Sequence, residues 1–501
     1  MVESSAGELL LLRDEPWPRR LGALAFAIIA LTAFYVWTYG DFVGRFFFLD
    51  DFWELREANN IHIGSPLDLL QFFRPVPFFL LYRPFSTLTY FYAIAHLFGN
   101  YPPYFHATQI TFHILNSLLV YAIADRLLLS RPFALATAFV YATAPGHAIA
   151  VCWIALFTMT GTAFFYFLGL WAWLQLAGRW RVPMTLLIYV VALLASEHAV
   201  TFPAALTLIT LLFSPRYEWR RIVREQAAFY VIALAYVATK LIYMHYILPR
   251  TMPFALAGYG MSLEPLSILS HIGRYLSYGI DALYTPHLED APGLWAGVAV
   301  VGIAAIATVG VVGGWWTARP SRVIAFGLDL YVVALAPVII LKAHQQSYYI
   351  GIAGLGLALA VIGFANALPR VSRIAPVAVV GALLFVHFNS TAALVRTSLE
   401  FQLFEGGSES AANWLYRLSS LRWFPTVQEV VVPKDPVTAR LFDDCEAHRI
   451  FLCASYRVRT TENILAEFKV PGRVIFKTWH SPRLLEPPGW RRSWEWLTPC
   501  P

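Results

Sequence analysis

The 501-residue sequence has few charged side chains: they make up 14% of it, whereas soluble domains carry about 25%. Hydrophobic residues make up 58%, and the mean hydropathy is +0.57. This scarcity of charge excludes an ordinary soluble protein and predicts a chain that lies mostly in membrane lipid. The net charge of +6 reflects arginines in short loops between apolar segments, so it does not indicate a nucleic-acid partner.

Cysteine is also rare, with four residues and no C-x-x-C pair, which argues against a zinc site. Cys445 and Cys453 would be able to form a disulfide in an oxidising compartment, but their spacing alone does not decide this. The glycine-rich loops that hold nucleotide phosphates are missing as well. A reaction outside the cytoplasm would therefore need a donor that travels in the membrane.

Long apolar segments recur through the first 395 residues, and most are long enough to cross the ~30 Å hydrocarbon core of a bilayer. They predict an all-α polytopic membrane protein with about eleven transmembrane helices. The fifth and sixth are short enough to form a re-entrant or tightly turned pair. The expected spans are 21–40, 104–127, 132–150, 157–176, 183–197, 199–213, 227–247, 292–315, 323–341, 346–366 and 374–394.

Arginines in alternate loops set the expected orientation, because positively charged loops stay in the cytoplasm. The protein is then expected in the inner membrane of the cell, with its N-terminus in the cytoplasm. The opposite side receives the first outer loop, 41–103, the loop 248–291, the segment near Lys342 and everything after residue 395. The arginines are Arg13, Arg19, Arg20, Arg126, Arg131, Arg179, Arg181, Arg216, Arg220, Arg221, Arg224, Arg319, Arg322, Arg370 and Arg373.

The last part of the chain has a different composition. Charged residues and proline become more frequent after residue 395, so the transmembrane domain 1–395 is expected to be followed by a small extracytoplasmic α/β domain, 396–501. Helices are expected near 409–418 and 439–448, and β-like runs at 427–432, 449–453 and 473–477.

Asp50 and Asp51 lie in the first outer loop, shortly after the first span, and are surrounded by aromatic residues. Acidic pairs at a membrane surface are costly to desolvate and usually have a functional role. The alternative is a solvated acidic loop without such a role. Paired carboxylates also suit hard cations, so a divalent ion bridged by Asp50 and Asp51 is an alternative to a metal-free site.

Polar residues also occur inside the expected spans. His106, Gln109, His113 and Asn116 follow one another at i, i+3, i+7 and i+10, on one face of the second span, which must meet protein or water. Helix–helix hydrogen bonding is one interpretation, and a site is the other, especially for His106 at the outer end. Glu197, at the junction of two short spans, points to an ion pair with an arginine or to a site.

Cations are expected near the outer surface, where the positive-inside rule disfavours them. A lipid phosphate would account for them, and ordinary headgroup contact is the alternative. Lys240 lies within a span and would be able to reach the surface with its long side chain. The group comprises Arg74, Arg83, Lys240, His245, His271, Arg274, Lys342 and His344.

In this order, these residues resemble the C-type glycosyltransferase superfamily of polytopic membrane enzymes (GT-C). The resemblance is closest to the protein O-mannosyltransferase-like branch, whose eukaryotic members carry tetratricopeptide repeats, and it covers roughly residues 20–395. It rests on Leu49-Asp50-Asp51, on Tyr82-Arg83-Pro84-Phe85-Ser86-Thr87-Leu88 (similar to the family's Y-R-P-L-T-T-L), on Phe105-His106, His113, Asn116, Pro145, His147 and Trp153, on Glu197-His198-Ala199-Val200-Thr201-Phe202-Pro203 (similar to K-E-x-A-V-T-L-P), and on Gln346-Ser347-Tyr348-Tyr349.

The resemblance implies transfer of a sugar from a polyprenyl-phosphate donor to a protein, lipid or glycan acceptor outside the cytoplasm. Asp50 or Asp51 would be the catalytic base. No cofactor is required, because cations would neutralise a monophosphate leaving group. The implied phosphate-binding residues are Arg274, Lys342, His344 and Lys240, and the implied site-shaping residues are Arg83, His106, Glu197 and Tyr348.

The chain also departs from this family. Ile149 and Ala155-Leu156-Phe157 stand where the family has an acidic residue and G-R-x-D, and Ser196 stands where it has a lysine. No period of ~34 residues follows residue 395, so the repeat array is missing. The acceptor class and the donor sugar therefore stay open. The alternative function is a non-catalytic transporter, flippase or scaffold for lipid-linked sugars, since buried polar groups serve a transporter as well.

Overall fold

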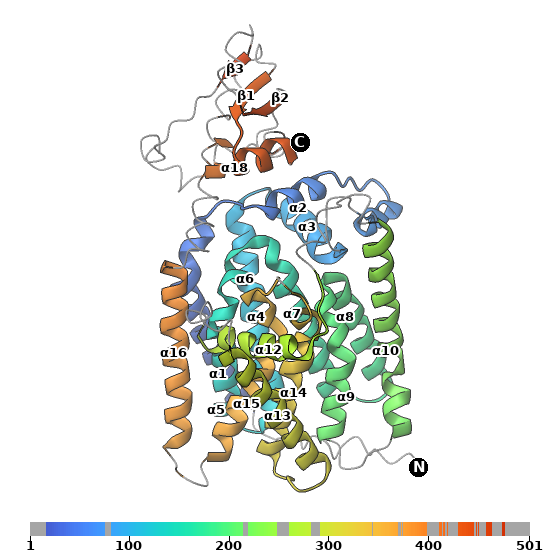
Figure 1. Cartoon of the computed structure of the whole chain (residues 1–501), viewed down its shortest axis with the longest axis vertical. Helices are drawn as coiled ribbons and strands as arrows, with labels where there is room; N and C mark the ends of the chain where they lie inside the picture. Colours follow the sequence, from blue (N-terminus) through green and yellow to red (C-terminus); the bar gives the residue numbers. More distant parts are fainter. Residues whose placement is uncertain are drawn as a thin grey trace.

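The computed structural model describes residues 17–75, 82–213, 219–247, 260–281, 291–342, 344–368, 372, 374–397, 410–412, 414–415, 418, 429–444, 447, 449, 457–462 and 473–475. Helices dominate them, and the chain is an all-α polytopic membrane protein (Figure 1). The helices of the bundle are α1 (Trp17–Tyr39), α4 (Pro102–Leu128), α5 (Arg131–Thr143), α6 (Ala148–Cys152), α7 (Phe157–Gln175), α8 (Arg181–Ala195), α9 (Phe202–Phe213), α10 (Trp219–Ile242), α12 (Pro265–Ile280), α13 (Ala291–Val312), α14 (Arg319–Ile339), α15 (Ile350–Ala367) and α16 (Ala375–Thr397).

Nine helical segments of the described chain are long and apolar enough to cross a membrane. A tenth span results if Arg131–Thr143 and Pro145–Cys152, which meet at an angle of 50°, count as one. The span expected at 199–213 belongs to a shorter apolar helix, Glu197–Phe213. At ~1.5 Å per residue this helix is shorter than the ~30 Å core of a bilayer.

The expected outer loops are largely helical. The loop 41–103 folds into α2 (Asp50–Asn59), η2 (Pro66–Phe73), η3 (Pro84–Thr89) and α3 (Tyr90–Phe98), and α2 and α3 lie across one end of the bundle (Figure 1). The loop 248–291 contains α12, which the sequence analysis missed. α12 packs closely on α13, where Gly273 and Gly297 bring the two backbones together.

Three short strands form a parallel sheet in the order β2-β1-β3, beyond the end of the bundle that carries α2 (Figure 1). β1 (Glu429–Pro433) and β3 (Arg473–Ile475) lie where β-like runs were predicted. The third strand, β2, is Arg457–Thr461, and residues 450–453 of the run predicted at 449–453 lie outside the described residues. Val430–Val432 are all buried, as expected for a central parallel strand covered on both faces. Cys445, Cys453 and Cys500 lie outside the described residues, so the disulfide stays a prediction.

Candidate functional site

The acidic pair opens helix α2 after a strained residue. Leu49 has φ 44° and ψ −105°, a backbone conformation that a branched side chain rarely adopts and that costs roughly 1–3 kcal/mol. The chain turns there, so that Asp50 and Asp51 form the first turn of α2. The N-terminus of a helix interacts favourably with negative charge, so this position stabilises both carboxylates.

Asp51 is fully buried and bound on both of its oxygens. Its Oδ2 accepts a hydrogen bond from the backbone N–H of Phe48 at 2.8 Å, and its Oδ1 accepts one from Ala155 at 2.7 Å. Burial raises the pKa of Asp51 well above its ordinary value, while these two donors act in the opposite direction. Asp51 therefore ties α2 to the turn that begins α7.

Asp50 is the accessible member of the pair, with 48% of its side chain exposed. Its Oδ1 lies 2.9 Å from Nη2 of Arg440, and its Oδ2 makes no hydrogen bond with the described residues. Partial burial raises the pKa of Asp50, and Arg440 acts against this rise. A carboxylate in this state has a free oxygen and a pKa moved towards the working range of a general base.

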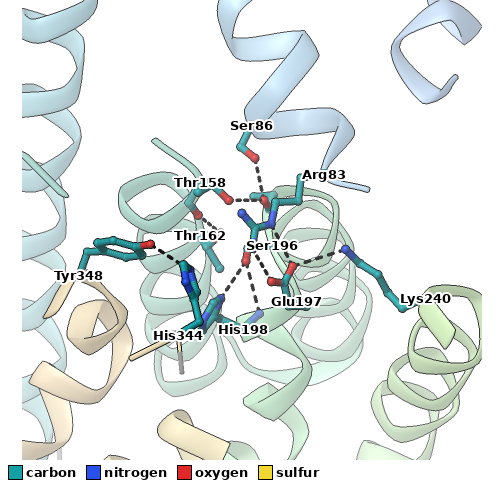
Figure 2. A network of polar contacts seen from close by, with 11 residues as sticks. Arg83, Ser86, Thr158, Thr162, Ser196, Glu197, His198, Lys240, His344 and Tyr348 are labelled. Carbon is teal, nitrogen blue, oxygen red and sulfur yellow. Dashed lines mark hydrogen bonds and ion pairs between the residues drawn. The ribbon is translucent and has the colours of Figure 1, made fainter. Parts of the chain in front are cut away.

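A second polar group lies around Glu197, between α8 and α9 (Figure 2). Arg83 binds its carboxylate with two nitrogens, and Nε lies 3.0 Å from Oε2. Nζ of Lys240 lies 3.4 Å from the same oxygen. These side chains are 13%, 9% and 25% exposed for Arg83, Lys240 and Glu197, so two cations share one carboxylate in a place with little water. Cations with so little exposure attract anions strongly.

Histidine and tyrosine side chains complete this group (Figure 2). The ring of His198 stacks on Tyr349 at 5.0 Å, and its Nδ1 lies 2.9 Å from the hydroxyl of Ser196. Nε2 of His344 lies 3.4 Å from the hydroxyl of Tyr348. Burial and the charge of the neighbouring Arg83 lower the pKa of His344.

Glu54 connects the acidic turn to the cationic group. It is 6% exposed, and burial together with Asp51 and Asp50 raises its pKa well above the ordinary value, while Arg83 acts against this rise. The helix α2 also packs against η3, which begins directly after Arg83. The two groups are therefore neighbours at one end of the bundle. The sequence analysis missed Glu54, although its spacing of four from Asp50 puts both on one helical face.

Other predicted site residues lie at different distances from this centre. Arg274 donates from Nη1 to Oε1 of Gln345, the residue after His344, at 2.8 Å. Lys342 is exposed, and its backbone N–H donates to the oxygen of Gly260 at 2.8 Å. His106 is buried near Arg45.

Two residues of the polar stripe on α4, Gln109 and Asn116, hold helices together. Asn116 donates to the backbone oxygen of Thr160 at 3.0 Å, and Gln109 donates to the Thr160 hydroxyl at 3.2 Å. Both residues are fully buried. The interpretation as helix–helix hydrogen bonding is thus confirmed for Gln109 and Asn116, in agreement with the cost of leaving polar groups unbonded in lipid.

Metal-ligand chemistry has a narrow basis in this centre. Across the described part of the chain, no three or more His, Cys, Asp or Glu side chains are grouped so that they could hold a metal ion. Both oxygens of Asp51 already accept backbone hydrogen bonds.

Comparison with known proteins does not identify a family, since no family model and no curated protein matches the chain.

Proposed function

We propose that the chain is a membrane glycosyltransferase of the GT-C type, which transfers a sugar from a polyprenyl-phosphate donor to an acceptor outside the cytoplasm. The observation that carries the proposal is the packing of α2, which begins with Asp50 and Asp51, against η3, which follows Arg83 directly. Arg83 and Lys240 form a cationic group on Glu197. A transferase of this kind needs both a base for the acceptor and cations for the departing phosphate.

Asp50 is the proposed base, and Asp51 the residue that holds the turn. A base must reach the proton that it removes, and Asp50 is half-exposed with one oxygen available, whereas Asp51 is enclosed by the backbone of Phe48 and Ala155. Of the two aspartates that the sequence leaves open as the catalytic base, Asp50 is therefore the one proposed.

Arg83, Lys240 and His344 are the proposed phosphate-binding residues, with Arg274 at the edge. Arg83 and Lys240 both contact Glu197, and their low exposure strengthens their attraction for an anion. Lys342 is not part of the proposed set, because it is exposed, in contrast to Arg83 and Lys240.

The proposed step is a single displacement with inversion at the anomeric carbon. The acceptor hydroxyl gives its proton to Asp50 as its oxygen bonds to the anomeric carbon. The bond between that carbon and the phosphate oxygen breaks, and its electron pair stays on the polyprenyl phosphate. Arg83 and Lys240 stabilise the charge that develops there. No metal takes part in this sequence of events.

Transfer of radiolabelled sugar tests the proposal. Purified protein in detergent is given a panel of synthetic polyprenyl-phosphate sugars, with native membrane extract as acceptor. Wild type should transfer label, and Asp50→Asn should lose on the order of 10²–10⁴-fold in rate. Asp41→Asn, an exposed carboxylate of the same loop, is the matched control and should transfer normally. Absence of transfer and of donor consumption by wild type would refute the proposal.

A transporter or flippase for lipid-linked sugars is the second candidate, favoured by the 50° break between Arg131–Thr143 and Pro145–Cys152. Broken helices and buried ions are common at transporter binding sites. Proteoliposomes separate the two candidates. Movement of a labelled polyprenyl-phosphate sugar between leaflets, unchanged in Asp50→Asn and without transfer to acceptors, would favour the transporter.

A further inference from the structure

The C-terminal residues contact the acidic turn through one arginine. Arg440 belongs to η14 (Ala439–Asp444), and its Nη2 lies 2.9 Å from Oδ1 of Asp50. The centre of its guanidinium lies 3.5 Å from the centroid of the Trp53 ring. One side chain thus binds both the carboxylate and the aromatic face of α2, from a position 390 residues later in the sequence.

This contact is supported by a shared apolar cluster. Phe52 and Leu55 of α2 belong to the same buried cluster as Leu415, Leu441 and Phe442 of the C-terminal part. Arg56 of α2 also donates a hydrogen bond to the backbone oxygen of Asp444. The packing of η14 on α2 therefore restricts Arg440. Its side chain loses less conformational entropy on pairing with Asp50 than an unsupported surface arginine would lose.

We propose that Arg440 is a positioning residue for Asp50, so that the C-terminal part completes the transferase centre instead of being a separate attachment. The inference rests on the proposed function. The guanidinium binds Oδ1 and holds the carboxylate in place, and the acceptor hydroxyl would bind Oδ2. The stacking on Trp53 fixes the arginine in turn.

The charges that face Asp50 determine how Arg440 would act on its titration. From α2 itself come Asp51 and Glu54, which disfavour a second negative charge. From η14 come Arg440 and Asp444, and Arg440 lies 3.8 Å from Asp444 as well. Arg440 acts against the rise in the pKa of Asp50 that burial causes, and its removal would raise this pKa further.

The test compares pH–rate profiles of full-length wild type, Arg440→Ala and Arg440→Lys. The acidic limb, which reports ionisation of the base, should move up by about half a unit to one unit in Arg440→Ala, with a fall in kcat. Arg440→Lys keeps the charge without the planar fork and should restore the limb more than kcat. Arg459→Gln, whose partner is Glu429 in the sheet, is the matched control. Thermal unfolding verifies that each variant is folded.

A second readout does not need activity. Carbodiimide labels protonated carboxyls, so mass spectrometry can follow labelling of Asp50 against pH. Labelling should extend to higher pH in Arg440→Ala and not in Arg459→Gln. Unchanged labelling and an unchanged limb would overturn the proposal, and so would a faster Arg440→Ala, since the arginine would then be a block. If wild type transfers no sugar, the proposed function fails, and an unmoved labelling curve would remove the Arg440–Asp50 coupling as well.

Discussion

Truncation of Asp51 should separate the roles of the two neighbouring aspartates. Asp51→Ala removes the acceptor of two backbone hydrogen bonds, from Phe48 and Ala155, and the N–H of Ala155 is buried. A buried donor without a partner costs about 1–3 kcal/mol, and the second, partly buried donor adds about 1 kcal/mol. The free energy of unfolding should therefore fall by about 2–4 kcal/mol.

Asp50→Ala is the matched comparison, because it shortens the same side chain one position earlier. Its partner Arg440 is held by a half-exposed ion pair, which is worth about 0–1 kcal/mol. Asp51→Asn should lie between the two, since the amide keeps one acceptor oxygen but turns an NH₂ group towards a backbone N–H. Activity should follow a different order, because Asp50→Ala and Asp50→Asn lose transfer while the fold stays intact.

The assay is thermal unfolding of detergent-purified protein, recorded beside sugar transfer for each variant. The Tm should fall most for Asp51→Ala, less for Asp51→Asn and least for Asp50→Ala. If Asp51→Asn unfolds like wild type and abolishes transfer while Asp50→Asn remains active, the base is Asp51 and the reasoning from its two backbone donors is wrong.

Three further predictions concern the cationic group, the third carboxylate and helix packing. Lys240→Met should lower kcat/KM for the donor at least tenfold, and the exposed Lys434→Met should not. The folded-state pKa of Glu54 lies above its unfolded value of about 4.3, so its contribution to stability falls as the pH rises above about 4.3, and Glu54→Gln should flatten the dependence of Tm on pH there. Gly297→Ala would put a methyl group 1.8 Å from the backbone oxygen of Leu269 and should strongly destabilise the protein. Gly302→Ala, where a methyl group would have nothing within 4 Å, should be neutral or stabilising by up to about 1 kcal/mol. Unfolding midpoints measure these differences in stability.

The spans could be predicted from the sequence because a bilayer imposes length and apolarity on each helix. The same constraint explains why Gln109 and Asn116 were expected to face protein and do so. The short helix Glu197–Phe213 was already exceptional in the sequence by its length. The helix α12 was missed because polar residues interrupt its apolar pattern, which shows one buried face rather than a continuous span.

The acidic pair could be recognised from the local sequence, since Asp50 and Asp51 lie in the first outer loop, shortly after the first span. The sequence could not say which aspartate is enclosed, because the donor that binds Asp51 is the backbone of Ala155, 104 residues away. A backbone N–H carries no signal in the residue type that bears it. Arg440 is equally silent in the sequence, at a separation of 390 residues from Asp50. Composition and periodicity thus determined the membrane architecture, while the balance of charges around Asp50, Glu54 and Arg83 was decided by tertiary packing, because Coulomb interactions and desolvation depend on distances in space and not along the chain.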